Sequence, residues 1–189
     1  MSLVFITGGV RSGKSAYAER YVHRLGQIRN AGRYVYLATG VATDNEMLKR
    51  IERHRLDRLV SEKRWYTVEA PYTIPDALRN LQLNDVVLWD CATTWLTNCF
   101  YEGYDTGTPC VTIQGCVSKK IEQMKETLLE VLHRGIAIIV VSNEVLDDLP
   151  YTDDESKYYR QCLGELNQWF VAHAKEAYEL DYGIVKKWK

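Results

Sequence analysis

The sequence has no hydrophobic run long enough to cross a membrane, because its longest fully apolar stretch is only Ile136–Val141. It also has no excess of charge of either sign. There are 24 Lys and Arg residues against 25 Asp and Glu residues, so the formal net charge is -1. A balanced charge gives no electrostatic footprint for nucleic acid or for an anionic membrane surface. We therefore expect neither a membrane span nor a nucleic-acid partner.

The cysteines lack the patterns of a disulfide scaffold or a structural zinc site. The chain has five of them, an odd number, and no C-x-x-C pair. Most of them are therefore interpreted as buried thiols. The chain also opens on a strand-like run and not on the pattern of a secretory signal. A reducing cytoplasm is the simplest setting for such a sequence.

Repeats, low-complexity tracts and linkers are absent as well. The 189 residues suit one domain with a sizeable core, which we place at residues 1–189. Hydrophobic residues make up 46% and charged residues 26%, as in ordinary soluble globular proteins. Composition therefore indicates a soluble globular protein, and a prediction of its function depends on the motifs.

Short apolar runs alternate with helix-like stretches along the chain. The expected strands are Leu3–Ile6, Tyr34–Ala38, Trp65–Val68, Val86–Trp89 and Ala137–Ser142. The expected helices are Lys14–Leu25, Asn45–Ser61, Pro75–Leu81, Ile113–His133 and Asp154–Glu176. Near the end, Tyr178–Leu180 and Ile184–Trp188 flank a turn and predict an antiparallel hairpin. This order predicts an α/β fold with a mainly parallel sheet and helices on both faces.

The strongest motif is G-G-V-R-S-G-K-S, which fits the P-loop pattern G-x-x-x-x-G-K-[ST]. Its glycines let backbone N–H groups converge on a phosphate, and the following helix adds positive charge at its N-terminus. Lys14 can reach the β- and γ-phosphates, and the Ser15 hydroxyl can ligate Mg²⁺. A glycine turn that never meets phosphate is the other interpretation, but the flanking strand and helix argue against it. The candidate phosphate-binding residues are Gly8, Gly9, Val10, Arg11, Ser12, Gly13, Lys14 and Ser15.

A second feature is the apolar strand Val86–Trp89, which runs directly into Asp90. In a P-loop fold a carboxylate at this place lies near the Mg²⁺ that the P-loop serine helps to hold. Strands also end in Asp because Asp favours turns, so the motif gains its meaning from the P-loop. Ser15 and Asp90 are the candidate magnesium residues, in direct contact or through water.

Of the four histidines, His54 has the most unusual neighbours, with four arginines within four positions of it. One interpretation is a half-buried histidine on the apolar side of a helix whose arginines face solvent. The other is a histidine in a basic patch that clamps an anionic nucleotide, where nearby positive charge keeps the imidazole neutral and nucleophilic. The pattern alone favours the first interpretation.

Taken in order, the motifs resemble one family, and the resemblance covers nearly the whole chain. The segments that carry it are Thr7–Ser15, Tyr36–Thr39, Asp44–His54, Thr67–Pro71, Asp90–Asn98, Val141–Val145 and Gly164–Gln168. The family is the bifunctional adenosylcobinamide kinase / adenosylcobinamide-phosphate guanylyltransferase of cobalamin biosynthesis. No later motif is decisive alone, but their order and spacing together are specific.

The resemblance implies an enzyme with two activities. A kinase step would move a γ-phosphoryl group from ATP or GTP to the aminopropanol hydroxyl of adenosylcobinamide, with Lys14 and Mg²⁺ stabilising charge. A second step would transfer GMP from GTP through a covalent guanylyl-histidine at His54 and give adenosylcobinamide-GDP. The family's P-loop NTPase domain assembles as a trimer, which implies a homotrimer here. The further nucleotide contacts carried over from the family are Ala38, Thr39, Gly40, Arg55, Leu56, Asp57, Arg58, Glu69 and Asp90.

The chain also departs from the family pattern. The usual glycines are missing between residues 146 and 150, the motif at 157–161 is altered, and Leu59 replaces a usual proline. The changes at 146–161 lie toward the expected substrate side. They leave open a P-loop kinase that acts on another small metabolite without guanylyltransferase activity. A nucleotide-dependent switch without transfer chemistry is a third interpretation, although the sequence shows no interaction tail.

Overall fold

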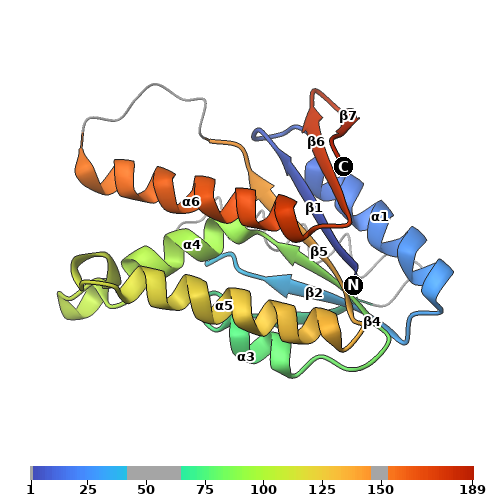
Figure 1. Ribbon diagram of the computed structural model, residues 1–189, viewed down its shortest axis with the longest axis horizontal. Coiled ribbons are helices and arrows are strands. Elements are labelled where there is room, and N and C mark those ends of the chain that lie inside the picture. Colours follow the sequence, from blue (N-terminus) through green and yellow to red (C-terminus); the bar gives the residue numbers. More distant parts are fainter. Residues whose placement is uncertain (1, 42–64, 146–152) are drawn as a thin grey trace.

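The computed structural model describes residues 2–41, 65–145 and 153–189, which are built around one sheet (Figure 1). Its strands are β1 (Ser2–Gly8), β2 (Arg33–Ala38), β3 (Trp65–Glu69), β4 (Asp85–Asp90), β5 (Ala137–Asn143), β6 (Glu176–Asp181) and β7 (Ile184–Lys187). Among the described residues the spatial order is β3-β2-β4-β5-β1-β6-β7. All neighbouring strands are parallel except β6 and β7. The predicted mainly parallel sheet with a C-terminal antiparallel pair is therefore confirmed.

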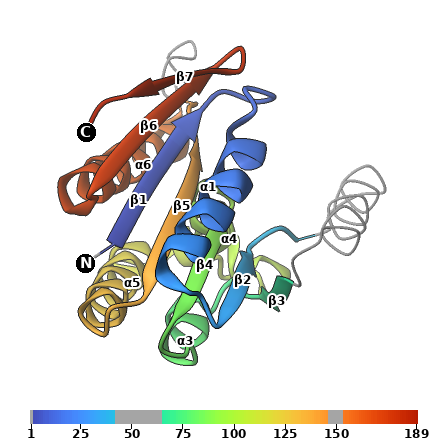
Figure 2. The same cartoon turned by 90° about the vertical axis from the view of Figure 1, so that its right-hand side faces the viewer.

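Helices cover both faces of this sheet, as the sequence predicts. In the described part of the chain they are α1 (Lys14–Arg29), α3 (Ile74–Arg79), α4 (Ala92–Tyr101), α5 (Cys116–His133) and α6 (Asp154–His173). Helix α1 packs on one face, and the other four pack on the opposite face (Figure 2). Successive strand side chains alternate between the two layers: Leu88 and Ile139 lie on the α1 side, and Trp89 and Val140 on the other.

The bulkiest part of the core joins β4 to helices α4 and α6. Trp89 is completely buried, and its ring centre lies 5.7 Å from that of Trp95 in α4 and 5.9 Å from that of Phe170 in α6. Both pairs meet edge to face, the arrangement that aromatic rings prefer. Burial of each side chain of this size contributes about 3 kcal/mol. These contacts hold α4 and α6 side by side near the carboxyl end of β4.

Several element boundaries differ from the sequence prediction. Helix α4 is not expected from the sequence, because its Thr-Thr-Trp start has weak helix propensity; burial of its apolar side chains overrides that weakness. Helix α5 begins at Cys116 rather than Ile113, after two short 3-10 turns, η1 (Tyr104–Thr106) and η2 (Cys110–Thr112). Helix α6 ends at His173, and Glu176 already belongs to β6. The expected helix Asn45–Ser61 lies outside the described residues.

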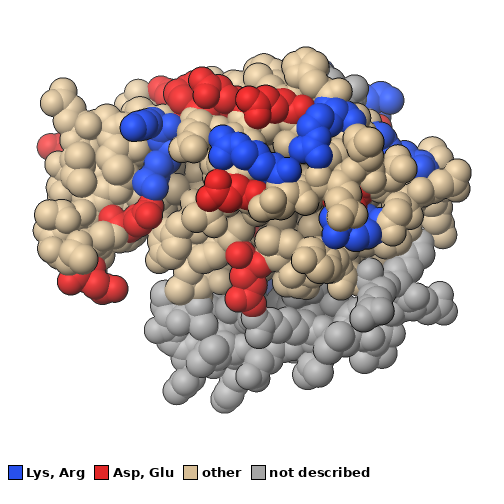
Figure 3. Space-filling view, turned by 90° about the horizontal axis from the view of Figure 1, so that it is seen from below, with Lys and Arg blue, Asp and Glu red and all other residues tan. Residues whose placement is uncertain are grey.

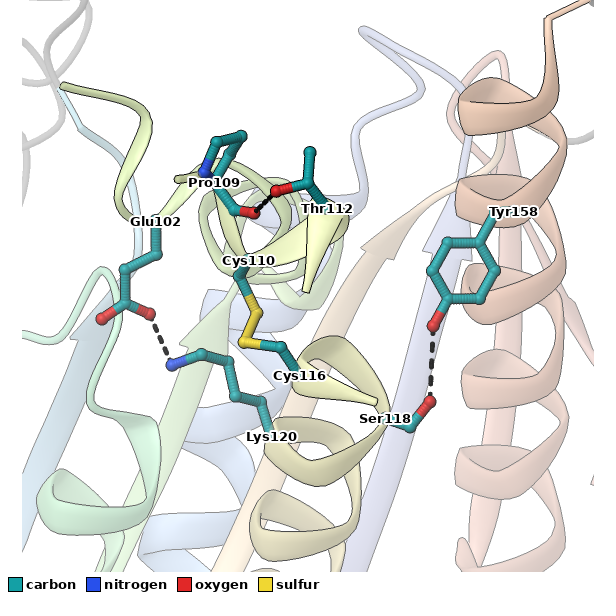
Figure 4. The surroundings of a disulfide bond; sticks show 8 residues. All are labelled: Glu102, Pro109, Cys110, Thr112, Cys116, Ser118, Lys120 and Tyr158. Carbon is teal, nitrogen blue, oxygen red and sulfur yellow. Dashed lines mark hydrogen bonds and ion pairs between the residues drawn. A yellow bond between two sulfur atoms is a disulfide. The ribbon is translucent and has the colours of Figure 1, made fainter. Parts of the chain in front are cut away.

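A disulfide joins Cys110 of η2 to Cys116, the first residue of α5 (Figure 4). The sequence analysis did not predict this pair, whereas the other three cysteines are free and buried, in agreement with the interpretation of most cysteines as buried thiols. Lys120 of α5 also pairs with Glu102 at 2.5 Å, so the α4–α5 connection is held at both ends. Closing so short a loop contributes about 2 kcal/mol in the chain-entropy account. Sequence spacing did not reveal the pair, because the two cysteines are six positions apart and only the turn of η2 brings them together.

The surface carries charges of both signs. On the face that Figure 3 shows, the Lys and Arg side chains of the described residues are interleaved with Asp and Glu. None of the described helices is both long enough and apolar enough to cross a membrane.

The β6–β7 hairpin is closed by a two-residue turn and an ionic cluster. Tyr182 and Gly183 both have positive φ, 47° and 80°, which is the type I′ pattern that matches strand twist. At the other end of the hairpin, the Tyr178 hydroxyl donates a hydrogen bond to the Glu176 carboxylate, which also pairs with Lys187 at 3.1 Å. The hydrogen bond from Tyr178 is the main cause that lowers the pKa of Glu176 below its ordinary value of 4.5.

Replacing Glu176 with glutamine tests this cluster. A lowered folded-state pKa means that the carboxylate stabilises the fold above its unfolded-state pKa and loses that effect as the pH falls through the folded-state value. We expect Glu176→Gln to lower the free energy of unfolding by about 1 kcal/mol at pH 7. Urea unfolding should show this difference shrink as the pH falls below 4.5.

Glu122→Gln is the matched control, because Glu122 is 64% exposed and pairs with Lys125 one turn away on α5. Its effect should stay below about 0.5 kcal/mol. An effect of Glu176→Gln that is the same at every pH would contradict the assigned ionic role.

Candidate active site

The P-loop connects β1 to α1 where the parallel strands have their carboxyl ends, which we call the carboxyl edge of the sheet. Strand β1 ends at Gly8 and helix α1 begins at Lys14, as the motif predicts. Gly13 precedes the helix with a φ of 89°, in the left-handed region that glycine adopts without strain. The first N–H groups of α1 and the positive end of its dipole therefore point into the loop. That arrangement binds a phosphate.

Lys14 is held against the same loop. Only 8% of its surface is exposed, and its Nζ donates a hydrogen bond to the Gly9 carbonyl oxygen at 2.9 Å. The ammonium group thus lies beside the backbone that would surround the β- and γ-phosphates of a nucleotide. Ser15 follows it in the first turn of α1 and is half-buried. Val10 and Arg11 lie on the exposed side of the loop.

The C-terminal hairpin supports the loop from the side. The Gly183 N–H at the hairpin tip donates to the Ser12 carbonyl oxygen at 3.1 Å. Gly8 lies so close to β6 that an added Cβ would be 2.3 Å from the Leu180 carbonyl oxygen and 2.7 Å from Ser12 Oγ. Packing against β6 therefore requires glycine at the first motif position, in addition to any need for a phosphate to approach the backbone.

Three candidate residues end neighbouring strands in exact register. Ala38 of β2 pairs with Glu69 of β3 on one side and with Asp90 of β4 on the other. The Asp90 carboxylate accepts a hydrogen bond from the Tyr36 hydroxyl at 3.1 Å, which orients it at the strand end. Only β5 lies between β4 and β1, so this carboxylate is at the same sheet edge as the P-loop. A serine hydroxyl and a carboxylate at one edge are donors that suit Mg²⁺.

Thr39 is completely buried and ties the strand ends together. Its Oγ1 donates to the Cys91 carbonyl oxygen and accepts from the Cys91 N–H, both at 2.8 Å. Asn98 of α4 donates to the carbonyl oxygens of Thr39 and Pro71 at 2.8 and 2.9 Å. Burial raises the pKa of the Cys91 thiol, so it stays protonated near neutral pH. The side chain of Thr39 thus builds the edge, and Gly40 beside it is exposed.

A polar network between β5, α4 and α6 had no role assigned from the sequence. Thr93 Oγ1 accepts from the Asn143 N–H at 2.7 Å and lies 3.0 Å from Ser142 Oγ. Ser142 Oγ in turn donates to Asn167 Oδ1 at 2.9 Å. Asn143 also pairs in register with Gly8, so the network adjoins the P-loop. The sequence did contain a signal for this network, because polar residues follow the apolar run of β5. Polar residues at the carboxyl end of a parallel strand lie where ligands bind.

The structure gathers the P-loop, Ala38, Thr39, Gly40, Glu69 and Asp90 at one edge. His54 and the adjacent Arg55, Leu56, Asp57 and Arg58 lie outside the described residues. Their part in the site stays a prediction.

The packing of Gly8 yields a matched pair of variants. Gly8→Ala should lower the free energy of unfolding by roughly 1–3 kcal/mol, because backbone atoms leave no space for a methyl group. It should also weaken GTP binding, measured by calorimetric titration. Gly9→Ala should stay within about 0.5 kcal/mol of the parent, since its Cβ would meet nothing within 4 Å and the motif leaves that position free. Equal losses in both variants would contradict this account.

Comparison with known proteins finds one family that matches nearly the whole chain. Residues 4–187 match the family model described as cobinamide kinase / cobinamide phosphate guanyltransferase. The bifunctional adenosylcobalamin biosynthesis protein CobU of Escherichia coli (strain K12) is 30% identical over 189 residues, covering 99% of each chain. The bifunctional adenosylcobalamin biosynthesis protein CobP of Pseudomonas aeruginosa is 34% identical over 169 residues, covering 85% of this chain and 86% of its own.

Among solved structures, a KaiC-like protein from Pyrococcus horikoshii OT3 has a TM-score of 0.50 at 12% identity. The similarity covers 95% of this chain and 71% of that one, and it supports the fold alone. The sequence match over nearly the whole length is the stronger finding. By that match, the chain belongs to the cobinamide kinase / cobinamide phosphate guanyltransferase family.

Proposed function

We propose that this protein phosphorylates adenosylcobinamide with a nucleoside triphosphate and then transfers GMP from GTP to the product, giving adenosylcobinamide-GDP. The observation that carries the proposal is the family match over residues 4–187, together with a P-loop whose lysine and serine lie in the expected places. The names of the curated relatives, which describe bifunctional adenosylcobalamin biosynthesis proteins, support it.

The kinase step takes place at the P-loop. The aminopropanol oxygen of the acceptor attacks the γ-phosphorus, the bond to the bridging oxygen breaks, the nucleoside diphosphate leaves and the hydroxyl proton is released. Backbone N–H groups of the loop and the start of α1 hold the β- and γ-phosphates. The Lys14 ammonium, already beside the Gly9 carbonyl, neutralises charge on the transferring group.

A magnesium ion fits the donors at this edge. Ser15 at the start of α1 and Asp90 at the end of β4 would hold it with the nucleotide phosphates, directly or through water. When bound, the ion supplies positive charge to the phosphate oxygens. The described residues contain no group of three His, Cys, Asp or Glu side chains that could hold a metal without substrate.

The guanylyl transfer is assigned to His54. A ring nitrogen of His54 attacks the α-phosphorus of GTP and pyrophosphate leaves, so that GMP is held as a phosphoramidate. A phosphate oxygen of the phosphorylated acceptor then attacks the same phosphorus and the N–P bond breaks. Arg55 to Arg58, with Glu69 and Asp90, are the proposed guanine-nucleotide contacts.

Three broader properties belong to the same proposal. We assign the chain to one P-loop transferase domain over residues 1–189, to a homotrimer and to the cytoplasm. In a cytoplasm that keeps thiols reduced, the Cys110–Cys116 pair would exist partly or wholly as thiols. The homotrimer is carried over from the family resemblance, and analytical ultracentrifugation would test it directly.

Two variants should separate the two activities. His54→Ala should reduce guanylyl transfer by about a thousandfold or more, because its nucleophile is gone, and should largely retain phosphoryl transfer. Lys14→Ala should reduce phosphoryl transfer by roughly a hundredfold or more. Phosphoryl transfer is measured as the formation of adenosylcobinamide phosphate from adenosylcobinamide and ATP. Guanylyl transfer is measured as the formation of adenosylcobinamide-GDP from GTP and synthetic adenosylcobinamide phosphate.

His133→Ala is the control histidine, since His133 lies exposed in the last turn of α5 and its Nδ1 contacts its own helix at the Leu129 carbonyl. It should keep both activities. Loss of both activities in a folded His54→Ala protein would count against the division of roles. Turnover of another hydroxylated metabolite, with adenosylcobinamide inert, would favour a simple P-loop kinase.

A further inference from the structure

A pocket of about 380 Å³ lies between α4 and α6, outside the phosphate-binding loop. Figure 1 shows these two helices next to one another. Residues from both helices line the pocket, with one more from the segment that follows β5. They are Thr93, Thr97, Tyr101, Val145, Glu155, Ser156, Tyr159 and Arg160.

The pocket adjoins the P-loop through the backbone of β5. Thr93 on its wall accepts a hydrogen bond from the Asn143 N–H at 2.7 Å. Asn143 pairs with Gly8, and the next residue, Glu144, donates its N–H to the Gly8 carbonyl oxygen at 2.9 Å. One strand therefore separates the pocket wall from the first residue of the P-loop. A group that enters the pocket is placed beside a nucleotide held in that loop.

The wall near β5 is rich in hydroxyl groups that already form hydrogen bonds. The Tyr159 hydroxyl donates to the Thr93 carbonyl oxygen at 3.2 Å and lies 3.1 Å from Thr97 Oγ1. Farther along the helices, the Tyr101 hydroxyl donates to Glu155 Oε1 at 2.6 Å. Arg160 also lines the pocket. Such a lining suits a short polar chain that carries an alcohol and later a phosphate ester, because hydroxyls can donate and accept and a guanidinium pairs with phosphate.

The volume of the pocket limits which part of the acceptor can enter it. Pockets of roughly 300–1,000 Å³ hold small molecules or parts of larger ones. A corrin macrocycle with its peripheral amides and its adenosyl ligand exceeds the space here, whereas an aminopropanol arm fits. The reaction also needs only the end of that arm, because its hydroxyl must align with the γ-phosphorus.

We propose that this α4–α6 pocket receives the aminopropanol arm of the corrinoid end first, with the hydroxyl directed toward the P-loop. The macrocycle then stays outside, next to Tyr101, which lines the pocket and is still 46% exposed. This assignment rests on the proposed function, since it takes adenosylcobinamide as the acceptor. It adds the location, the orientation and the part of the substrate that determines specificity.

The test fills the pocket and compares two ligands. Thr97→Phe places a ring in the space from α4, and Ser156→Phe does so from α6, where the Ser156 backbone N–H can keep its bond to Asp153. The ligands are adenosylcobinamide and the same corrinoid without its aminopropanol arm. Their dissociation constants are measured from the quenching of tryptophan fluorescence, and that of GTP by calorimetry.

In the parent protein we expect the arm to tighten binding by about tenfold or more, equal to about 1.4 kcal/mol. Each Phe variant should bind adenosylcobinamide about as weakly as the armless corrinoid, and its affinities for the armless corrinoid and for GTP should be those of the parent. Thr112→Phe, the same substitution on an exposed residue of η2, should change none of the three values.

Three results would overturn the assignment. The first is unchanged adenosylcobinamide binding in both Phe variants that keep GTP affinity. The second is an equal loss for both corrinoids, which would place the macrocycle itself in the pocket. The third is a parent protein that binds GTP but no corrinoid, which would reject the proposed function and the pocket assignment with it. A variant that loses GTP affinity as well is misfolded, and the other Phe variant then decides.

Discussion

The parallel register of the central strands is the constraint on which the site depends. Parallel strands place all their carboxyl ends at one edge, and the pairings Ala38–Glu69, Ala38–Asp90 and Gly8–Asn143 bring the ends of five strands, β1 to β5, to that edge. Helix α1 then starts at the same edge, and only β5 lies between β1, which leads into this helix, and β4, which ends at Asp90. Such an edge can bring together nucleotide phosphates, a metal ion and an acceptor, and short loops after the strands are enough to form the site.

Side-chain bonds make this edge rigid where strand pairing ends. Buried Thr39 and half-buried Asn98 join β2 and β4 to the segment after β3, and Thr93 joins α4 to β5. The hairpin tip supports the P-loop through Gly183. A site held in this way needs little reorganisation when ligands bind, which favours precise alignment of a transferring group. The same bonds explain why so many buried polar groups occur at one end of the sheet.

The fold and the position of the P-loop between β1 and α1 could be predicted from the sequence, because both depend on local pattern. Continuous apolar runs such as Val86–Trp89 indicate buried parallel strands, and the P-loop glycines have fixed spacing. Helix α4 was not predicted, because burial of its apolar side chains outweighs the weak helix propensity of its first turn. The disulfide and the α4–α6 pocket were not predicted, because each joins residues that only the fold brings together. The close approach of Gly8 to Leu180 is likewise a contact between segments far apart in the sequence.

We propose that one nucleotide-binding edge serves two transfers, the second through a covalent histidine. The most direct test incubates the protein with Mg²⁺ and GTP labelled at the α-phosphate, quenches the reaction and measures label retained on the protein. The account predicts label that is labile in acid, stable in alkali and absent from His54→Ala. GTP binding without any retained label would contradict the guanylyl-histidine and leave a P-loop kinase alone.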